Sequence, residues 1–170
     1  MKKIAVFGSA FNPPSLGHKS VIDALGHFDR ILLIPNIAHA WGKDMLDYSI
    51  RCQLVDAFID DLGCERIGRS DIEERLYQPG ESVTTFSVLT ELQRLYPEDE
   101  ITFVIGPDNL FKFANFYKAE QIVSRWALLT CPQKLAIRST DIRRAINDKK
   151  EVSGLVTPKV CRLLAEKNYY

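Results

Sequence analysis

Short apolar runs alternate along this chain with longer stretches in which apolar residues recur every three or four positions. The short runs are typical of strands buried on both faces of a sheet, and they occupy residues 4–7, 30–35, 65–69, 101–105 and 126–130. The longer stretches predict helices over residues 17–27, 50–62, 86–96 and 139–146, and from Thr157-Pro158 onward. Residues 71–82 are polar and contain Pro79-Gly80, so they are predicted to form a loop.

The order of these elements predicts the fold class. Strand, helix and strand within residues 4–35 form a βαβ unit, whose two strands must be parallel. Continued alternation predicts a Rossmann-like α/β fold, with an open, mainly parallel sheet and helices on both faces. The 170 residues suit a single domain over residues 1–170, with a C-terminal helical part from about 139 to 170.

Composition narrows the classes of function. Basic and acidic residues balance at 22 each, so the net charge predicts no non-specific attraction to nucleic acid or to an anionic membrane. No apolar run approaches the roughly 20 residues that span a bilayer, and the run at 4–7 is too short for a secretion signal. The four cysteines form no C-x-x-C pair and have no metal-ligand spacing with the histidines. We therefore expect a cytoplasmic protein that acts on small molecules, with no metal site of its own and an oligomeric state that stays open.

The loop from Gly8 to His18 follows the first strand, and ligands bind at the carboxyl ends of strands in such sheets. Two familiar phosphate loops are excluded, because Pro13 and Pro14 stand where a P-loop needs glycine and lysine, and Ala10 where a dinucleotide loop needs glycine. His18 lies near a helix start, where free amides and the dipole favour anions, so it can donate to a phosphate. A solvent-facing residue in the first turn is the alternative, and we favour the phosphate role.

A second helix start repeats this design. Ser139 or Thr140 is expected as the N-cap, with hydroxyls that can bind phosphate, and Arg143 lies one turn onward for a bidentate contact. The alternative is an ordinary capped helix with an exposed arginine. Asp108 could bind a ribose hydroxyl or water on Mg²⁺, or it could cap a helix beginning near Asn109. Arg51 could reach a phosphate or form an exposed ion pair.

Four segments together resemble a known family. Residues 8–18 are similar to the signature G-x-F-x-P-x-(H or T)-x-(G or x)-H of a nucleotidyltransferase superfamily, and most resemble nicotinate or nicotinamide mononucleotide adenylyltransferases. Residues 105–108 look like that family's strand-end G-x-D, and residues 138–143 are similar to its S-S-T-x-I-R motif. Residues 155–170 resemble its last helix, so the resemblance covers nearly the whole chain and implies a fold of the nucleotidyltransferase type.

The resemblance implies adenylyl transfer from ATP, with Mg²⁺, to nicotinate mononucleotide, giving nicotinate adenine dinucleotide and pyrophosphate. Other acceptors stay open, namely nicotinamide mononucleotide and phosphopantetheine, as does a nucleotide-binding module without catalysis. Catalytic roles are implied for His18, Lys43 and Arg143. ATP-binding roles are implied for Gly8, Ser9, Ala10, Phe11, Ser15, His18, Gly106, Asp108, Ser139, Thr140 and Arg143. Acceptor-binding roles are implied for Trp41, Lys43, Val83, Thr84 and Thr85.

The chain departs from the family pattern at several of these positions. Ser15 replaces a histidine or threonine, and it keeps a hydroxyl without supplying charge. Val83 and Phe86 replace a tyrosine and an acidic residue of an S-Y-T-x-D-T-like stretch. Lys43 stands in for the lysine of a P-P-H-K-like element, and Trp41 could stack on a heterocycle or anchor a lid. The identity of the acceptor is therefore left for the structure and for experiment.

Overall fold

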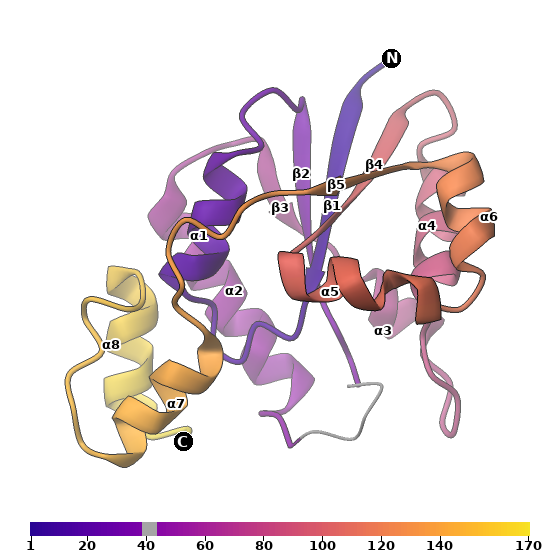
Figure 1. Ribbon diagram of the computed structural model, residues 1–170. Helices are drawn as coiled ribbons and strands as arrows, with labels where there is room; N and C mark the ends of the chain where they lie inside the picture. Colours follow the sequence, from indigo (N-terminus) through magenta and orange to yellow (C-terminus); the bar gives the residue numbers. More distant parts are fainter. Residues whose placement is uncertain (39–43) are drawn as a thin grey trace.

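A single sheet organises the chain, and the computed structural model describes residues 1–38 and 44–170 (Figure 1). The sheet has five strands in the order β3-β2-β1-β4-β5, and every neighbouring pair is parallel. The strands are β1 (Lys3–Ser9), β2 (Arg30–Pro35), β3 (Ile67–Arg69), β4 (Glu100–Ile105) and β5 (Ala127–Thr130). The chain runs outward from β1 to β3 and then returns to β4 beside β1, so the strand order reverses between β1 and β4. The predicted open, parallel α/β fold is confirmed.

Eight α-helices are present in the described part of the chain. They are α1 (Leu16–Asp23), α2 (Tyr48–Leu62), α3 (Ile72–Leu76), α4 (Thr85–Leu95), α5 (Pro107–Lys112), α6 (Ala119–Arg125), α7 (Ser139–Asn147) and α8 (Pro158–Lys167). A 3₁₀ helix, Phe113–Asn115, follows α5 directly. Figure 1 shows α1, α2, α7 and α8 on one side of the sheet, and α3, α4 and α6 on the other. Helices therefore cover both faces, as the sequence predicts.

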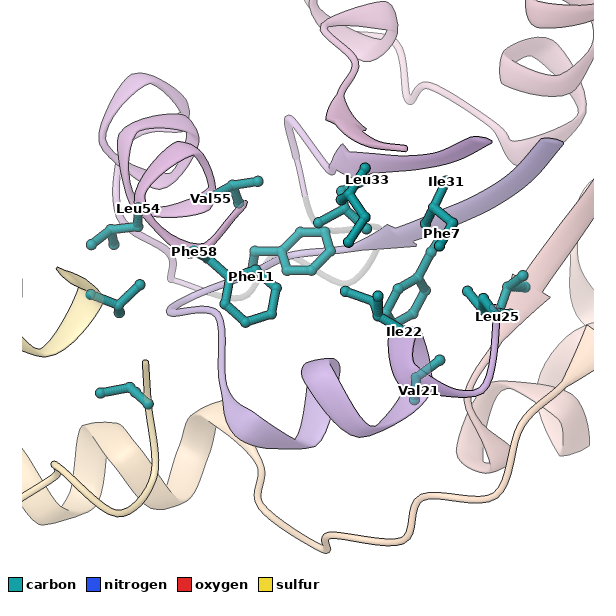
Figure 2. Close-up of a cluster of buried hydrophobic side chains, with 14 of the residues drawn as sticks. Phe7, Phe11, Val21, Ile22, Leu25, Ile31, Leu33, Leu54, Val55 and Phe58 are labelled. Atoms are coloured by element: carbon teal, nitrogen blue, oxygen red, sulfur yellow. The ribbon is translucent and has the colours of Figure 1, made fainter. Parts of the chain in front are cut away.

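The alternation of side chains along β1 builds two hydrophobic clusters, one on each face. Ala5 and Phe7 join the cluster formed with α1, α2, α7 and α8, whereas Ile4 and Val6 join the cluster formed with α3, α4 and α6. Figure 2 shows the first cluster, in which Phe11 lies between α1 and α2. Because both faces are buried, each strand reads as a continuous apolar run, which is why the strands are visible in the sequence.

Two sequence predictions about helices are wrong, and one about the start of α8 is confirmed. Residues 71–82 are not wholly a loop, because Ile72–Leu76 forms α3, whose single turn is too short for a helical apolar pattern to stand out. The N-cap of α7 is Arg138, and neither Ser139 nor Thr140. The predicted start of α8 is confirmed, because Thr157 occupies its N-cap and Pro158 its first helical position. The Thr157 side chain makes no cap hydrogen bond there.

The C-terminal helices are fastened to the rest of the fold by polar contacts as well as by the core. The Lys159 amide at the start of α8 donates to the Asp61 carboxylate at 2.8 Å, and the Lys159 Nζ pairs with Asp60 at 2.6 Å. Asp61 thereby supplies the cap expected from Thr157. None of the helices in the described ranges combines the length and the apolar content needed to cross a membrane. All four cysteines are free thiols.

Arg51, on α2, is buried at 1 % exposure and ties three loop segments together. Its Nε donates to the Leu46 carbonyl at 2.7 Å, and its guanidinium NH₂ groups donate to the carbonyls of Ala10 at 2.9 Å, Asn36 at 2.6 Å and Ile37 at 3.3 Å. The sequence leaves Arg51 open between a phosphate contact and an exposed ion pair, and the structure contradicts both. The side chain instead satisfies carbonyls that would otherwise be buried without a donor.

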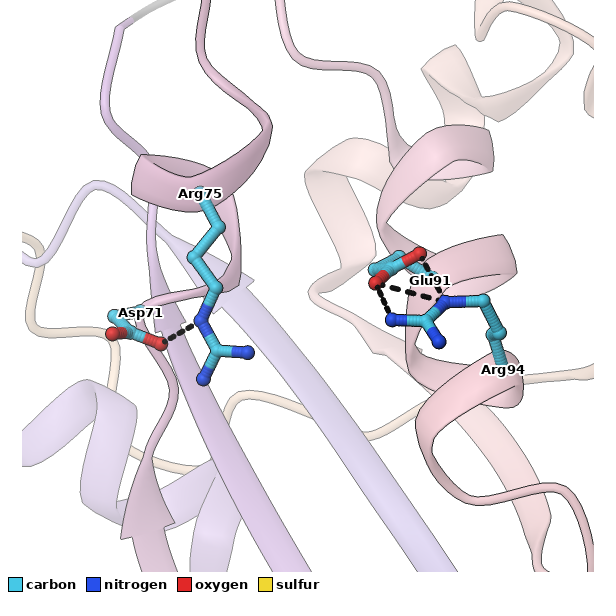
Figure 3. Close-up of polar contacts among 4 residues, drawn as sticks. All are labelled: Asp71, Arg75, Glu91 and Arg94. Carbon is cyan, nitrogen blue, oxygen red and sulfur yellow. Dashed lines mark hydrogen bonds and ion pairs between the residues drawn. The ribbon is translucent and has the colours of Figure 1, made fainter.

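We expect Arg51→Ala to lower the free energy of unfolding by about 3 kcal/mol, because it leaves several buried carbonyls without partners. The matched control is Arg94→Ala on the surface of α4, where Arg94 pairs with Glu91 in solvent (Figure 3). Loss of that exposed pair should change the unfolding free energy by about 0.5 kcal/mol or less. Urea unfolding followed by circular dichroism measures both, and equal effects of the two substitutions would contradict the anchoring role.

Candidate active site

A cavity of about 200 Å³ lies at the carboxyl ends of β1 and β4, where the strand order reverses. We call it the α1/α7 cavity, and its lining includes Gly8, Ser15, His18, Gly106 and Ser139. Ser15 and His18 belong to the start of α1, whereas Ser139 is the first residue of α7. Two helix N-termini that are far apart in the sequence thus meet in one cavity, which is the arrangement that the ATP-binding prediction requires.

Gly17 allows this meeting. A Cβ atom at Gly17 would lie 2.1 Å from the Ile137 carbonyl oxygen, so only glycine permits the segment before α7 to lie against α1. Two hydrogen bonds hold neighbouring segments at the same place. The Ser15 Oγ donates to the Ile137 carbonyl at 3.4 Å, and the Leu16 amide donates to the Leu155 carbonyl at 2.9 Å. The start of α1 is therefore a contact point for segments that precede both C-terminal helices.

His18 belongs to a capping box at the start of α1. Its Nδ1 accepts the Ser15 amide at 3.0 Å, while the Ser15 Oγ accepts the His18 amide at 3.2 Å. His18 thus takes the place that glutamate or glutamine usually has in this motif. Because Nδ1 accepts a hydrogen bond, a neutral imidazole carries its proton on Nε2, which lies 3.1 Å from the Ser9 Oγ. The structure gives Ser15 a second function, since it fixes both the tautomer and the direction of the His18 ring.

The surroundings of His18 keep the imidazole neutral. Burial lowers the pKa of His18 from its ordinary value of 6.5 to about 4. The Phe11 ring lies against the imidazole at a centroid distance of 4.7 Å, and the Phe7 ring lies at 6.1 Å. At neutral pH, His18 is therefore a hydrogen-bond donor through Nε2, and it contributes no positive charge.

The first-turn amides of α1 are mostly occupied. Those of Ser15, Leu16 and His18 already donate to His18 Nδ1, the Leu155 carbonyl and the Ser15 Oγ. The sequence predicts a helix start with several free amides, and the structure corrects this for α1. An anion in the α1/α7 cavity would instead compete with the Ser9 Oγ for the Nε2 proton of His18.

A second cavity of about 320 Å³ lies on the other face of the sheet. We call it the α4 cavity, and its lining includes Val83, Thr84 and Thr85 at the start of α4. Gly8 and Asn109 line both cavities. The two spaces therefore meet at the end of β1, and a ligand with two halves can occupy both faces of the sheet edge.

The start of α4 is suited to an anion. Thr84 is its N-cap, and the Thr84 Oγ1 accepts the Ser87 amide at 3.1 Å. The amides of Thr85 and Phe86 lie in the first turn, where a helix has no internal acceptor for them. Glu73, from α3, lines the same cavity, and its carboxylate accepts the Ile37 amide at 3.1 Å. Burial raises the pKa of Glu73 to about 7, which reduces its negative charge near neutral pH.

Comparison with known proteins agrees with this geometry. A family model described as cytidylyltransferase-like matches residues 6–145. The chain belongs to the cytidylyltransferase-like family.

Its relatives within the cytidylyltransferase-like family carry one recurring name. A crystal structure from Vibrio parahaemolyticus, provisionally named nicotinate-nucleotide adenylyltransferase, is 56 % identical to this chain. It covers all of this chain and 96 % of its own, with a TM-score of 0.90. A relative from Caldicellulosiruptor saccharolyticus with the same provisional name is 26 % identical over 201 residues, which span 99 % of this chain and 98 % of the relative.

A more distant solved structure supports the fold. The nicotinic acid mononucleotide adenylyltransferase of Plasmodium falciparum, complexed with NaAD, is 16 % identical to this chain and has a TM-score of 0.75. The match covers 99 % of this chain and 97 % of that one. The predicted family resemblance is therefore confirmed by the family model and by the relatives, and the α/β arrangement by the solved structures.

The structure sorts the site residues expected of this cytidylyltransferase-like protein into groups. The α1/α7 cavity brings together Gly8, Ser9, Ser15, His18, Gly106, Asp108 and Ser139. The α4 cavity brings together Val83, Thr84 and Thr85. Trp41 and Lys43 lie outside the described residues. The binding and catalytic roles of all these residues stay predictions.

Four expected ATP-binding residues, Ala10, Phe11, Thr140 and Arg143, are not part of the lining described for the α1/α7 cavity. The Ala10 carbonyl accepts a hydrogen bond from Arg51, and Phe11 is fully buried with a positive φ of 50°. Arg143 donates to the Asn12 carbonyl at 2.7 Å and to the Thr140 Oγ1 at 3.2 Å. The Arg143 guanidinium thus holds the loop before α1, and its phosphate contact stays a prediction.

Sequence reasoning missed several residues that line the cavities, among them Glu73, Asn109 and Arg138. Glu73 is hidden by the interpretation of residues 71–82 as a loop, although Ile72 and Leu76 have the spacing of one buried helical turn. Asn109 follows Asp108 and lines both cavities, and no motif singles it out. Arg138 is quoted only as the first residue of a motif, but it lines the α1/α7 cavity and pairs with Asp108 at 2.7 Å.

We expect Gly17→Ala to separate the starts of α1 and α7, because the added methyl group overlaps the Ile137 carbonyl. The substitution should lower the free energy of unfolding by about 1–3 kcal/mol and weaken ATP binding. Gly26→Ala is the matched control, since no described atom lies within 4 Å of a Cβ built there. Thermal unfolding and calorimetric ATP titration measure the two effects, and unchanged ATP affinity in Gly17→Ala would contradict the role.

His18 should make stability depend on pH in one direction. Its pKa is about 4 in the folded protein and 6.5 when exposed, so the unfolded chain binds the proton more tightly between these values. The contribution is complete above pH 6.5 and is lost as the pH falls towards 4. Glu73, with a folded pKa of about 7, acts in the opposite sense, because its stabilisation is lost as the pH rises from about 4.5 through 7.

The difference in unfolding free energy between the wild type and His18→Gln isolates the His18 effect, since Glu73 is common to both proteins. As the pH falls from 6.5 to 4, the wild type should lose unfolding free energy relative to His18→Gln. Urea unfolding at four pH values measures it. A difference that stays constant with pH would show that His18 keeps an ordinary pKa in the folded protein.

Proposed function

We propose that this chain transfers the adenylyl group of ATP to nicotinate mononucleotide, forming nicotinate adenine dinucleotide and releasing pyrophosphate. The observation that carries the proposal is the pair of cavities that meet at Gly8 and Asn109, at the reversal point of the sheet. A dinucleotide has two nucleotide halves joined by two phosphates, and open α/β sheets bind such ligands at this point. The recurring name of the family relatives supports the same reaction.

We assign ATP to the α1/α7 cavity. The start of α7 and the Nε2 proton of His18 are suited to phosphate oxygens, because oriented N–H groups favour anions. The acceptor then occupies the α4 cavity, with its phosphate near Gly8, where the two cavities meet. This division leaves the α4 cavity, whose lining includes Val6, Phe103 and Val88, for the flat pyridine ring.

The start of α4 favours nicotinate over nicotinamide. Nicotinate carries a carboxylate, and the first-turn amides of Thr85 and Phe86 can donate to it. Nicotinamide carries a neutral amide, which gains less from a helix N-terminus. The raised pKa of Glu73, about 7, limits repulsion between its carboxyl group and a bound carboxylate.

The reaction needs positioning more than it needs a base. An oxygen of the acceptor's phosphate attacks the α-phosphorus of ATP, a new P–O bond forms, and the bond to the β-phosphate oxygen breaks with its electrons leaving on pyrophosphate. The attacking oxygen is already ionised at neutral pH, because the second pKa of a phosphomonoester is about 6. His18, held neutral by its low pKa, donates a hydrogen bond from Nε2 and takes no proton from the acceptor. The catalytic contribution of this chain is thus orientation and donors aimed at phosphate oxygens.

Mg²⁺ fits this site as a companion of the phosphates. Within residues 1–38 and 44–170, no three His, Cys, Asp or Glu side chains gather closely enough to hold a metal ion. Asp108 is a carboxylate on the lining of the α1/α7 cavity, and Mg²⁺ is commonly bound by one carboxylate together with substrate phosphates and water. When bound there, the ion would neutralise part of the phosphate charge.

We place this reaction in the cytoplasm, with small-molecule nucleotides as the partners. Free thiols at all four cysteines suit a reducing compartment. A balanced net charge supports small anionic ligands over nucleic acid, because the attraction must come from the local donors of the two cavities.

We expect His18→Ala to lower turnover by about two to three orders of magnitude, because it removes an oriented donor to the reacting phosphates. His27→Ala is the control, since His27 is an exposed histidine packed on Phe28. A coupled assay of pyrophosphate release measures both variants with saturating ATP and nicotinate mononucleotide. Equal turnover in His18→Ala and wild type would refute the role of His18.

The same assay distinguishes the acceptors. Nicotinate mononucleotide should give a higher kcat/KM than nicotinamide mononucleotide and phosphopantetheine. A preference for either of the other two would overturn the assigned acceptor. Tight calorimetric binding of ATP without pyrophosphate release from any of the three would indicate a nucleotide-binding module without catalysis.

A further inference from the structure

Arg138 offers a positive charge to the α1/α7 cavity. Among the described residues that line this cavity, it is the one lysine or arginine. Arg143, which the sequence favours for phosphate binding, donates to the Asn12 carbonyl on the loop before α1. His18 is neutral at physiological pH, because burial lowers its pKa to about 4. A triphosphate in this cavity therefore meets the guanidinium of Arg138 as a ready cation on the described wall.

The partner of Arg138 is Asp108, and the pair lies in solvent. Its NH₂ group lies 2.7 Å from the Asp108 Oδ2, and the two side chains are 59 % and 62 % exposed. Exposed ion pairs contribute little to stability, since water and salt screen them. A phosphate group offers more negative charge and a bidentate geometry that matches guanidinium. An arriving triphosphate can therefore displace the carboxylate of Asp108 from Arg138.

The backbone of Arg138 is fixed, so only its side chain has to move. The Arg138 amide donates to the Asp141 carboxylate at 2.9 Å, and the Arg138 carbonyl accepts the Asp141 amide at 3.0 Å. The next residue, Ser139, donates from its hydroxyl to the Pro13 carbonyl at 2.7 Å. The first two bonds fix the start of α7 itself, and the third holds it beside the loop that precedes α1. The Arg138 guanidinium can therefore change position while the backbone that carries it stays in place.

We propose that Arg138 binds the phosphates of ATP, and that its ion pair with Asp108 is the resting arrangement that ATP replaces. This inference rests on the proposed function, because it assigns the triphosphate to the α1/α7 cavity. It names a phosphate-binding residue that the motif-based prediction does not include. It also gives Asp108 a role in the absence of nucleotide, which is to hold the Arg138 side chain at the edge of the cavity.

The test compares the KM for ATP with the KM for nicotinate mononucleotide in variants of Arg138. Arg138→Ala should raise the KM for ATP about tenfold and leave the KM for nicotinate mononucleotide unchanged, because a charge-assisted contact to ATP alone is lost. Arg138→Lys keeps the charge without the planar fork, so its KM for ATP should lie between those of Arg138→Ala and wild type. Arg75→Ala, which breaks the exposed pair with Asp71 on α3 (Figure 3), should leave both KM values unchanged.

Two results would overturn the proposal. One is an unchanged KM for ATP in Arg138→Ala, measured under conditions in which the wild type is active. This result would refute the role of Arg138 and leave the proposed function intact. The other is an equal rise in both KM values, which would indicate a structural role. If the wild type releases no pyrophosphate with any acceptor, the proposed function fails, and calorimetric titration with ATP then decides about Arg138 directly. Weaker ATP binding by Arg138→Ala than by wild type would support its role, and equal affinity would refute it.

The resting pair has its own test. Asp108→Asn removes the competitor for Arg138, so titration with ATP in the absence of Mg²⁺ should show binding about twofold to fivefold tighter than in wild type. Omitting Mg²⁺ removes any contribution of Asp108 through the metal. Weaker binding in this variant would contradict the resting role of the ion pair.

Discussion

The site depends on one close approach, between Gly17 at the start of α1 and the Ile137 carbonyl before α7. Without it, two helix starts separated by more than a hundred residues would not share a cavity. The parallel sheet brings the relevant loops to one edge, but it does not bring them into contact. That last step requires a position without a side chain, because a single methyl group would lie 2.1 Å from the carbonyl oxygen. The absence of a side chain at Gly17 therefore allows the starts of α1 and α7 to line one cavity.

Around this contact, several polar side chains bind the loop before α1, while His18 lies on the lining of the α1/α7 cavity. Arg143 and Ser139 donate to carbonyls of the Asn12–Pro13 turn, and the Tyr170 hydroxyl donates to the Asn12 Oδ1 at 2.5 Å. These donors come from the C-terminal helices and the tail that follows them. The C-terminal part thereby fixes the loop that carries the capping box of His18. Ser139 and Arg143, whose phosphate contacts stay predictions, thus hold the loop that precedes α1.

The sequence was sufficient for the sheet, because its strands are apolar runs buried on both faces. It also predicted that the loop after β1 lies at a cavity, because ligand loops follow the strands of such sheets. It was insufficient where tertiary contacts determine the position and the partners of a side chain. The buried state of Arg51 follows from four carbonyls supplied by turns that no local pattern reveals. Glu73 lies on a single helical turn, too short for a periodic signal. The pairing of Arg138 with Asp108 joins the N-cap of α7 to the first turn of α5, and spacing along the chain carries no information about it.

The charge balance of the site suits the reaction that we propose. The attacking and leaving groups are both phosphates, so charge is redistributed within the cavities while the total stays constant. Oriented neutral donors such as the Nε2 proton of His18 can stabilise phosphate oxygens throughout this redistribution without releasing or taking up a proton. A fixed excess of positive charge would bind substrates and products alike and would slow the release of pyrophosphate. A chain with no net charge can therefore bind highly charged nucleotides when its hydrogen-bond donors are held in place. In our proposal, the exposed cation Arg138 contributes by exchanging the Asp108 carboxylate for a phosphate.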